Sequence, residues 1–136
     1  MEENSLRQRV LDYAAQTYQT QPEYLWSRLP TFAVLRHEEN RKWYALVAAA
    51  PRSALGLSGG GEVPVLNVKC APALMDALLR QRGYYPGYHM NKGSWLTVLL
   101  DGSVAIEEIL PLIDLSYQAT ERKITPRRGK KLPPEA

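Results

Sequence analysis

Two alternating apolar runs joined by a short polar link restrict the fold of this chain more than any other feature of its sequence. Residues 31–37 and 42–49 alternate between two sets of side chains, which is the period of a strand whose two faces differ. The link, residues 38–41 (EENR), is short and polar, which favours an antiparallel hairpin. Strict alternation predicts that Trp43 and Ala45 lie on the same face of the second strand.

Periodicity predicts the remaining elements in the same way. The predicted elements are helices over 5–18, 71–82 and 104–120, strands over 31–37, 42–49, 63–69 and 95–100, and an irregular loop over 84–94. Ser5 and Gln8 have the spacing of a capping box at the start of the first helix. Pro111 removes a backbone donor inside the last helix, so we expect a kink there or a separate first turn.

The order of the elements, α-β-β-β-α-β-α, favours an antiparallel sheet, because at least three strands alternate rather than form continuous apolar runs. We therefore predict an α+β fold, a two-layer sandwich with the helices on one face of the sheet. The other face would be a polar and aromatic surface, partly covered by the loop 86–94. Its side chains would be drawn from Arg36, Trp43, Asn67, Lys69, Trp95 and Thr97.

The charge of the chain is concentrated in its last residues. The net charge is +3, but residues 121–136 carry six basic and two acidic side chains, whereas the first 120 residues carry 11 basic and 12 acidic ones. We interpret residues 1–122 as a single domain and residues 123–136, which are basic and rich in proline, as a disordered tail. The basic isoelectric point is therefore a weak argument for nucleic-acid binding by the domain itself.

The sequence also indicates the compartment in which the protein works. It holds no apolar run of about 18 residues, and its N-terminus is not a signal peptide, so we expect a cytoplasmic protein without membrane contact. Cys70 is the sole cysteine, which excludes an internal disulfide, and we expect it to be a small buried hydrophobe. We expect the domain to be a monomer.

One motif connects the sequence to a known family. The run PGYHMNKGSWLTVLLDG at 86–102 resembles the signature of the MmcQ/YjbR family, P-x-x-H-[ML]-N-K-x-x-W-x-T-V/I-x-L-D-G. Residues 34–47, 66–70 and 114–120 resemble the first hairpin, the third strand and the last helix of that family. Gly93, Pro111 and the basic tail depart from the pattern. The resemblance implies a frataxin-like (CyaY-like) fold, DNA binding through a double-wing motif, and no enzymatic activity.

DNA binding requires lysines, arginines and other hydrogen-bond donors for phosphate, and an exposed base can stack on an aromatic ring. The candidate residues are Arg36, Arg41, Lys42, Lys69, Tyr88, His89, Asn91, Lys92 and Trp95. The hairpin tip, residues 38–41, is a candidate wing, although Glu38 and Glu39 on this tip oppose phosphate binding. Asn91 and Lys92 have a second interpretation, in which they hold the loop together by capping a turn and bonding carbonyl groups.

Two other classes of function remain as alternatives. An enzyme would have to be built from Cys70, His89, Lys92 and Asp101, which do not make a complete acid–base set. Two histidines without spaced cysteine or acidic partners do not make a metal site, and the first helix lacks an acidic ridge for frataxin-like iron binding. We therefore expect no catalysis, no cofactor and no metal.

The alternative to DNA is a protein segment or a small ligand bound on the exposed sheet face beneath the loop 86–95. The residues that would line such a site are Trp43, Tyr88, His89 and Trp95. The sequence leaves the choice between DNA and this alternative open.

Overall fold

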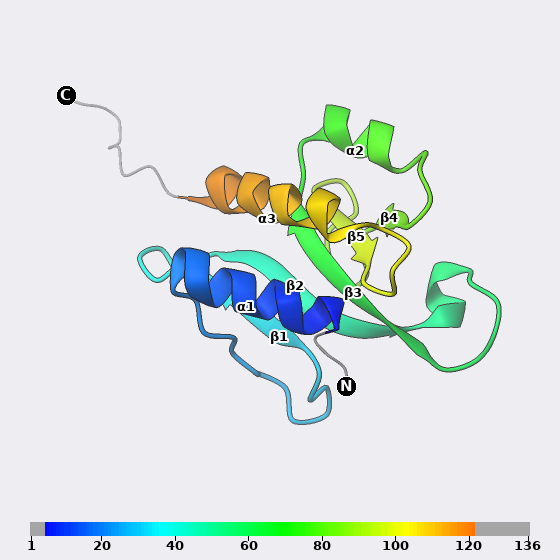
Figure 1. Ribbon diagram of the computed structural model, residues 1–136, viewed down its shortest axis with the longest axis horizontal. Coiled ribbons are helices and arrows are strands. Elements are labelled where there is room, and N and C mark those ends of the chain that lie inside the picture. The colour runs from blue at the N-terminus through cyan, green and yellow to red at the C-terminus, as the bar shows by residue number, and fades with distance from the viewer. Residues whose placement is uncertain (1–4, 122–136) are drawn as a thin grey trace.

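The structure, a computed structural model, describes residues 5–121, so the predicted tail at 123–136 lies outside the described residues. An antiparallel sheet with the strand order β1-β2-β3-β5-β4 carries the helices α1 and α3 side by side on one face (Figure 1). The elements are α1 (Leu6–Tyr18), β1 (Ala33–Arg36), β2 (Trp43–Pro51), the 3-10 helix η1 (Arg52–Leu55), β3 (Glu62–Lys69), α2 (Pro72–Leu78), β4 (Tyr84–Pro86), β5 (Trp95–Leu99) and α3 (Ile106–Thr120). The predicted α+β class, with an antiparallel sheet and a helical layer, is confirmed.

Three local predictions need correction. The sequence predicts a loop where β4 lies, because three residues are too few to show alternation. In the structure these residues pair with Val98, Thr97 and Leu96 of β5. The capping box is half formed, since Ser5 accepts from the Gln8 backbone N–H while the Gln8 side chain donates to Asp12 instead. The helix α3 runs unbroken through Pro111, so of the two outcomes expected there the separate first turn does not occur, and Ile109 and Ile113 on either side of the proline are both buried in the core.

A β-bulge interrupts the alternation predicted for β2. Leu35 pairs with Ala45 and Arg36 pairs with Trp43, so Tyr44 is the extra residue in the ladder. Tyr44 therefore joins Ala45 in the core beneath the helices, while Trp43 packs on the opposite face. The prediction that Trp43 and Ala45 share a face is wrong for this reason.

Both faces of the sheet are buried, which contradicts the prediction of an exposed polar face. One core lies between the sheet and the helices and includes Val10, Leu66 and Ile113. The second core, on the other face, packs against side chains of the segments 19–32 and 87–94, which fold over it. Asn67 and Thr97, predicted for the exposed face, have no exposed area as a result. No helix within residues 5–121 is long and apolar enough to cross a membrane.

Gly83, between α2 and β4, provides a test of this packing. Its φ of +95° lies in the left-handed region, and a Cβ atom would lie 2.5 Å from Cγ2 of Val104. We predict that Gly83→Ala lowers the free energy of unfolding by about 2 kcal/mol, since backbone strain and the steric conflict act together. Urea denaturation followed by tryptophan fluorescence measures this change.

Gly60→Ala is the matched control, because nothing lies within 4 Å of its added Cβ and its φ lies outside the left-handed range. We expect this variant to stay within about 0.5 kcal/mol of the parent protein. Equal unfolding free energies for the two variants would contradict the packing described around Gly83.

Candidate functional site

Most of the predicted DNA-binding residues lie at one end of the sheet, whereas the side chains of Tyr88 and His89 extend over its second face, where the His89 ring approaches Phe32. β1 ends at Arg36 and β2 begins at Trp43, so the hairpin tip lies at this end. The register pairs Ala45 with Val68 and Lys69 with Trp95, which places the end of β3 and the start of β5 there too. The loop 87–94 leads directly into Trp95. We call this region, with the hairpin tip, Lys69 and the loop 87–94, the tip end of the sheet.

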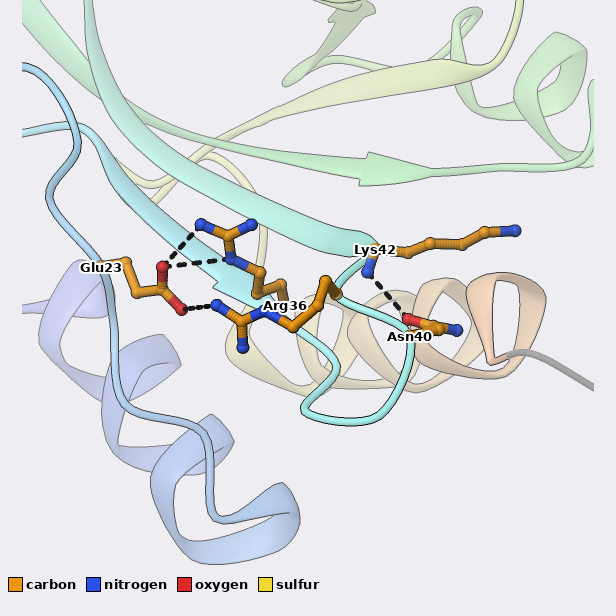
Figure 2. Close-up of polar contacts among 5 residues, drawn as sticks. Glu23, Arg36, Asn40 and Lys42 are labelled. Carbon is orange, nitrogen blue, oxygen red and sulfur yellow. Dashed lines mark hydrogen bonds and ion pairs between the residues drawn. The ribbon is translucent and has the colours of Figure 1, made fainter.

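Two of the predicted arginines are already paired with one carboxylate, which offsets one of their two charges. Arg36 donates to Oε1 of Glu23 from Nη2 at 2.6 Å and from Nε at 3.1 Å, and Arg41 donates from Nη2 to Oε2 at 3.1 Å (Figure 2). The hydrogen bond from Arg36 lowers the pKa of Glu23. Glu23 comes from the connector after α1, which reaches β1 through a bridge to Val34. Sequence reasoning missed Glu23, because no periodic pattern links it to the hairpin.

The hairpin tip is tied to the end of α3. The Asn40 side chain accepts from the Lys42 backbone N–H at 2.8 Å and donates to the Thr120 carbonyl at 3.0 Å. The Lys42 side chain extends away from the arginines in Figure 2 and is exposed. Its ammonium makes no hydrogen bond or ion pair with residues 5–121, so Lys42 remains available to an anion.

The loop 87–94 is held together by its own side chains. Lys92 donates from Nζ to the Gly87 carbonyl at 2.8 Å, and Asn91 accepts from the Gly93 backbone N–H at 2.8 Å. His89 has a φ of +62° and an exposed side chain. Asn91 and Lys92 therefore build the loop, as their second interpretation predicts, and their polar atoms are partly used before any ligand arrives.

The aromatic residues predicted for stacking cover the sheet instead of facing solvent. Trp95 is only 9% exposed, and Nζ of Lys69 lies 5.8 Å from the centre of its ring. Tyr88 is half-buried, and its ring lies 4.3 Å from that of His89, which in turn lies 6.1 Å from Phe32. Lys69 is exposed, so this group combines an accessible cation with aromatic rings that lie beneath the loop.

A polar cavity of about 460 Å³ lies on the other side of the hairpin tip. The ends of α1 and α3 and the tip line it, and its charged side chains are Glu23, Arg36, Glu38, Glu39, Arg41 and Glu121. Four carboxylates against two arginines make this cavity unfavourable for phosphate. The acidic residues of the predicted wing thus face a cavity that fits a cation better than DNA.

His37 lies in the wall of this cavity and was not among the predicted site residues. It is 5% exposed, packs 4.2 Å from the Tyr117 ring, and contacts Thr120 Oγ1 through Nε2 at 2.8 Å. The Thr120 hydroxyl donates to the Ser116 carbonyl, so its oxygen accepts from the His37 ring. Burial lowers the pKa of His37, while the carboxylates of Glu121 and Glu39 act in the opposite direction.

Cys70 was weighed as a nucleophile, and the histidine, cysteine and acidic side chains as metal ligands. Cys70 is buried in the helix-side core, and this burial raises the pKa of its thiol, the opposite of what activates a nucleophile. Within residues 5–121, no three histidine, cysteine or acidic side chains are placed to hold a metal ion. The groups that the tip end presents are hydrogen-bond donors, cations and aromatic rings, which can contact a ligand.

The fold and the tip end define a small α+β domain with a sheet buried on both faces and polar residues gathered at one end. The YjbR family model matches residues 15–119. The chain therefore belongs to the YjbR family, and the resemblance of residues 86–102 to the MmcQ/YjbR signature is confirmed.

Relatives of this family agree with the assignment. The chain is 37% identical over 115 residues to YyaQ of Bacillus subtilis, which covers 85% of this chain and 98% of that protein. It is 37% identical over 70 residues to YjbR of Escherichia coli K12, covering 51% of this chain and 58% of that protein. Both relatives are described as uncharacterised proteins, so their names carry no activity to this chain.

Solved structures have the same fold. A crystal structure of a Pseudomonas syringae protein has a TM-score of 0.82 at 43% identity, covering 85% of this chain and 98% of that one. A Deinococcus radiodurans protein, DR2400, has a TM-score of 0.58 at 23% identity, covering 79% of this chain and 72% of that one, and shares the fold alone.

The lowered pKa of His37 makes stability depend on pH. The folded state favours the neutral ring, whereas in the unfolded chain His37 titrates near its ordinary value of about 6.5. We predict that burial of the neutral His37 ring leaves the free energy of unfolding unchanged above about pH 6.5. As the pH falls below that value towards the lowered folded pKa, the free energy of unfolding decreases, because the unfolded chain binds a proton that the folded state does not. Melting temperatures between about pH 5 and 7.5 measure this slope.

His37→Gln should reduce the slope over this window, because the variant has no ring to protonate. His89→Gln is the control, since the His89 side chain is exposed, and it should keep the slope of the parent protein. If His37→Gln keeps the full slope, the buried neutral ring is not its source.

The bond from Lys92 to Gly87 gives a second prediction. Lys92→Met keeps most of the aliphatic chain and removes the donor, so we predict a loss of about 1 kcal/mol in the free energy of unfolding. Amide exchange at Tyr88 should also accelerate. Lys42→Met is the matched control and should change stability by less than about 0.5 kcal/mol. Equal effects of the two substitutions would contradict a structural role for Lys92.

Proposed function

We propose that the protein binds DNA weakly through the tip end of the sheet, without catalysis, as a monomer in the cytoplasm. One observation carries the proposal: the register gathers basic side chains from the β1–β2 hairpin, from the end of β3 and from the loop before β5 at one end of the sheet. Phosphate oxygens are bound by lysines, arginines and backbone N–H groups that lie close together in this way.

Lys42 and Lys69 carry most of the proposed phosphate contacts. Both side chains are exposed, and neither ammonium forms an ion pair within residues 5–121. Arg36 and Arg41 contribute less, because both are already bonded to Glu23, whose carboxylate offsets one of their two charges. Few free cations imply a low affinity and a shallow salt dependence, with a log–log slope of about −2 if two phosphates are neutralised.

The last described turn of α3 lies beside the hairpin tip. The last turn of α3 is bonded to the hairpin tip through Thr120, which contacts both His37 and Asn40. Residues 122–136 carry six basic side chains and follow directly after Glu121. This proximity supports a joint contribution of the domain and the following residues to phosphate binding.

A protein segment or small ligand is the second candidate, and the 460 Å³ cavity beside the hairpin tip favours it. Tyr117 offers an aromatic wall, and Glu38, Glu39 and Glu121 offer carboxylates without an ion pair among residues 5–121. This arrangement suits a cationic group, such as a lysine or arginine of a partner, rather than a phosphate.

Fluorescence anisotropy tests the proposal with labelled duplex and single-stranded DNA at about 50 and 200 mM salt, a fourfold range over which a slope of about −2 predicts a loss of about 16-fold in affinity. The full chain is compared with Lys69→Ala and with a truncation to residues 1–122. We expect Lys69→Ala to weaken binding about five- to tenfold, the contribution of one phosphate contact near 0.1 M salt.

Arg82→Ala is the charge-matched control. Arg82 is exposed and precedes Gly83, which bonds Leu99 at the opposite end of β5, so its loss should leave the affinity unchanged. Equal losses for Lys69→Ala and Arg82→Ala would indicate unspecific attraction. Binding by the full chain and none by the truncation would reject the domain as the DNA-binding part.

A further inference from the structure

A fully buried amide in the middle of the sheet has a polar atom without a partner. Asn67 lies on the central strand β3 with no exposed area. Its Nδ2 is the one buried side-chain nitrogen or oxygen within residues 5–121 that makes no hydrogen bond. Buried polar groups in folded proteins almost always have a partner, so an exception of this kind calls for a physical reason.

The hydrogen bonds around Asn67 fix which atom is free. The backbone N–H of Tyr88 donates to Thr97 Oγ1 at 2.8 Å, and the Thr97 hydroxyl donates to Oδ1 of Asn67 at 2.5 Å. Rotating the amide by half a turn would leave both the Thr97 proton and Oδ1 without partners. The amide orientation in the structure leaves one atom without a partner instead of two, so the free group is the N–H₂ donor of Asn67.

Aromatic rings and a cation lie next to this donor on the same face. The pair that follows Asn67 and Thr97 along the strands is Lys69 and Trp95, with Nζ of Lys69 5.8 Å from the ring centre. Tyr88 packs against the core of this face from the loop above it. These three groups match the three parts of a nucleotide. The amide donor fits an acceptor on the base edge, an aromatic ring stacks on the base plane, and the ammonium binds the phosphate.

We infer that the face beneath the loop 87–94 is a binding site for an unpaired nucleobase of a single strand, an inference that rests on the proposed DNA binding. The Asn67 amide donates to an acceptor on the edge of the base, the base stacks on Trp95, and Lys69 pairs with the adjoining phosphate. A duplex hides its bases by stacking and pairing, so the site selects single strands over duplex.

Access requires the loop to move, because Asn67 is fully buried. Two side-chain hydrogen bonds hold the loop in place: Tyr88 N–H to Thr97, and Lys92 Nζ to the Gly87 carbonyl. Displacing Tyr88 removes the N–H that donates to Thr97 Oγ1, so the same movement opens the site and adds an acceptor next to the Asn67 donor. A buried water molecule explains the free donor less well, since such a water needs about three partners. Of the two cross-strand neighbours of Asn67, Leu46 offers no polar side-chain atom and the Thr97 hydroxyl is already engaged.

Nuclear magnetic resonance of the full, ¹⁵N-labelled chain tests the site without any substitution. The side-chain N–H₂ signals of Asn67 are assigned by their absence in Asn67→Leu, a size-matched apolar variant. The protein is titrated with a thymidine 12-mer and with an abasic 12-mer that has the same number of phosphates. We expect the Asn67 signals to shift with the thymidine strand only, and the abasic strand to bind about tenfold more weakly. The side-chain signals of Gln81, exposed near the opposite end of β5, should not shift with either strand.

The variant provides an independent measurement by anisotropy, after its melting curve confirms that it is folded. Asn67→Leu should lose the difference between the thymidine and abasic strands while keeping the phosphate-driven binding common to both. Unchanged Asn67 signals under saturating binding of both strands would overturn the base site and leave the proposed DNA binding intact. Binding by neither strand at low salt would overturn both.

Discussion

The sheet of this protein is buried on both faces, and the arrangement of the helices and loops follows from the need to cover both of them. The central strand β3 demonstrates it: Leu66 packs beneath the helices, while Val65 and Asn67 lie beneath loops, all without exposed area. α1 and α3 cover one face with their apolar sides, as amphipathic helices do. The other face is covered mainly by the segments 19–32 and 87–94, which lack a continuous hydrogen-bond ladder and must be held by individual contacts.

Several of the charged side chains that the sequence predicts for DNA binding are engaged in those individual contacts. Glu23 anchors the first segment to the hairpin through Arg36 and Arg41, and Lys92 closes the loop onto the Gly87 carbonyl. Of the predicted DNA-binding residues, Lys42 and Lys69 form no ion pair within residues 5–121 and lie at the tip end, and Lys69 lies beside the Trp95 ring that covers the sheet. The proposed binding residues thus also have structural roles, which is why the proposal is weak binding coupled to loop movement and not a preformed charged groove.

Sequence reasoning succeeded where a local pattern determines the structure. The strands predicted at 63–69 and 95–100 agree with β3 and β5 to within one residue, because alternation and flanking turn residues mark them. The bulge at Tyr44 escaped prediction, since residues 43–49 are all apolar or aromatic and no polar residue within the strand shows which side chains share a face. At the site, the loop and its self-bonding Asn91 and Lys92 could be predicted. The pairing of Arg36 with Glu23 and the burial of the second face could not, because both depend on how a connector without periodicity folds back over the sheet.

The central claim is that the tip end and the loop above the second face are where nucleic acid meets the domain. Amide hydrogen exchange of the full chain, measured with and without a single-stranded oligonucleotide, tests it most directly. The account predicts that exchange changes at Lys42, at Lys69 and across residues 87–97, and stays constant in α1 and in the outer turns of α3. Changes confined to the helical face, or to residues beyond 121, would contradict it.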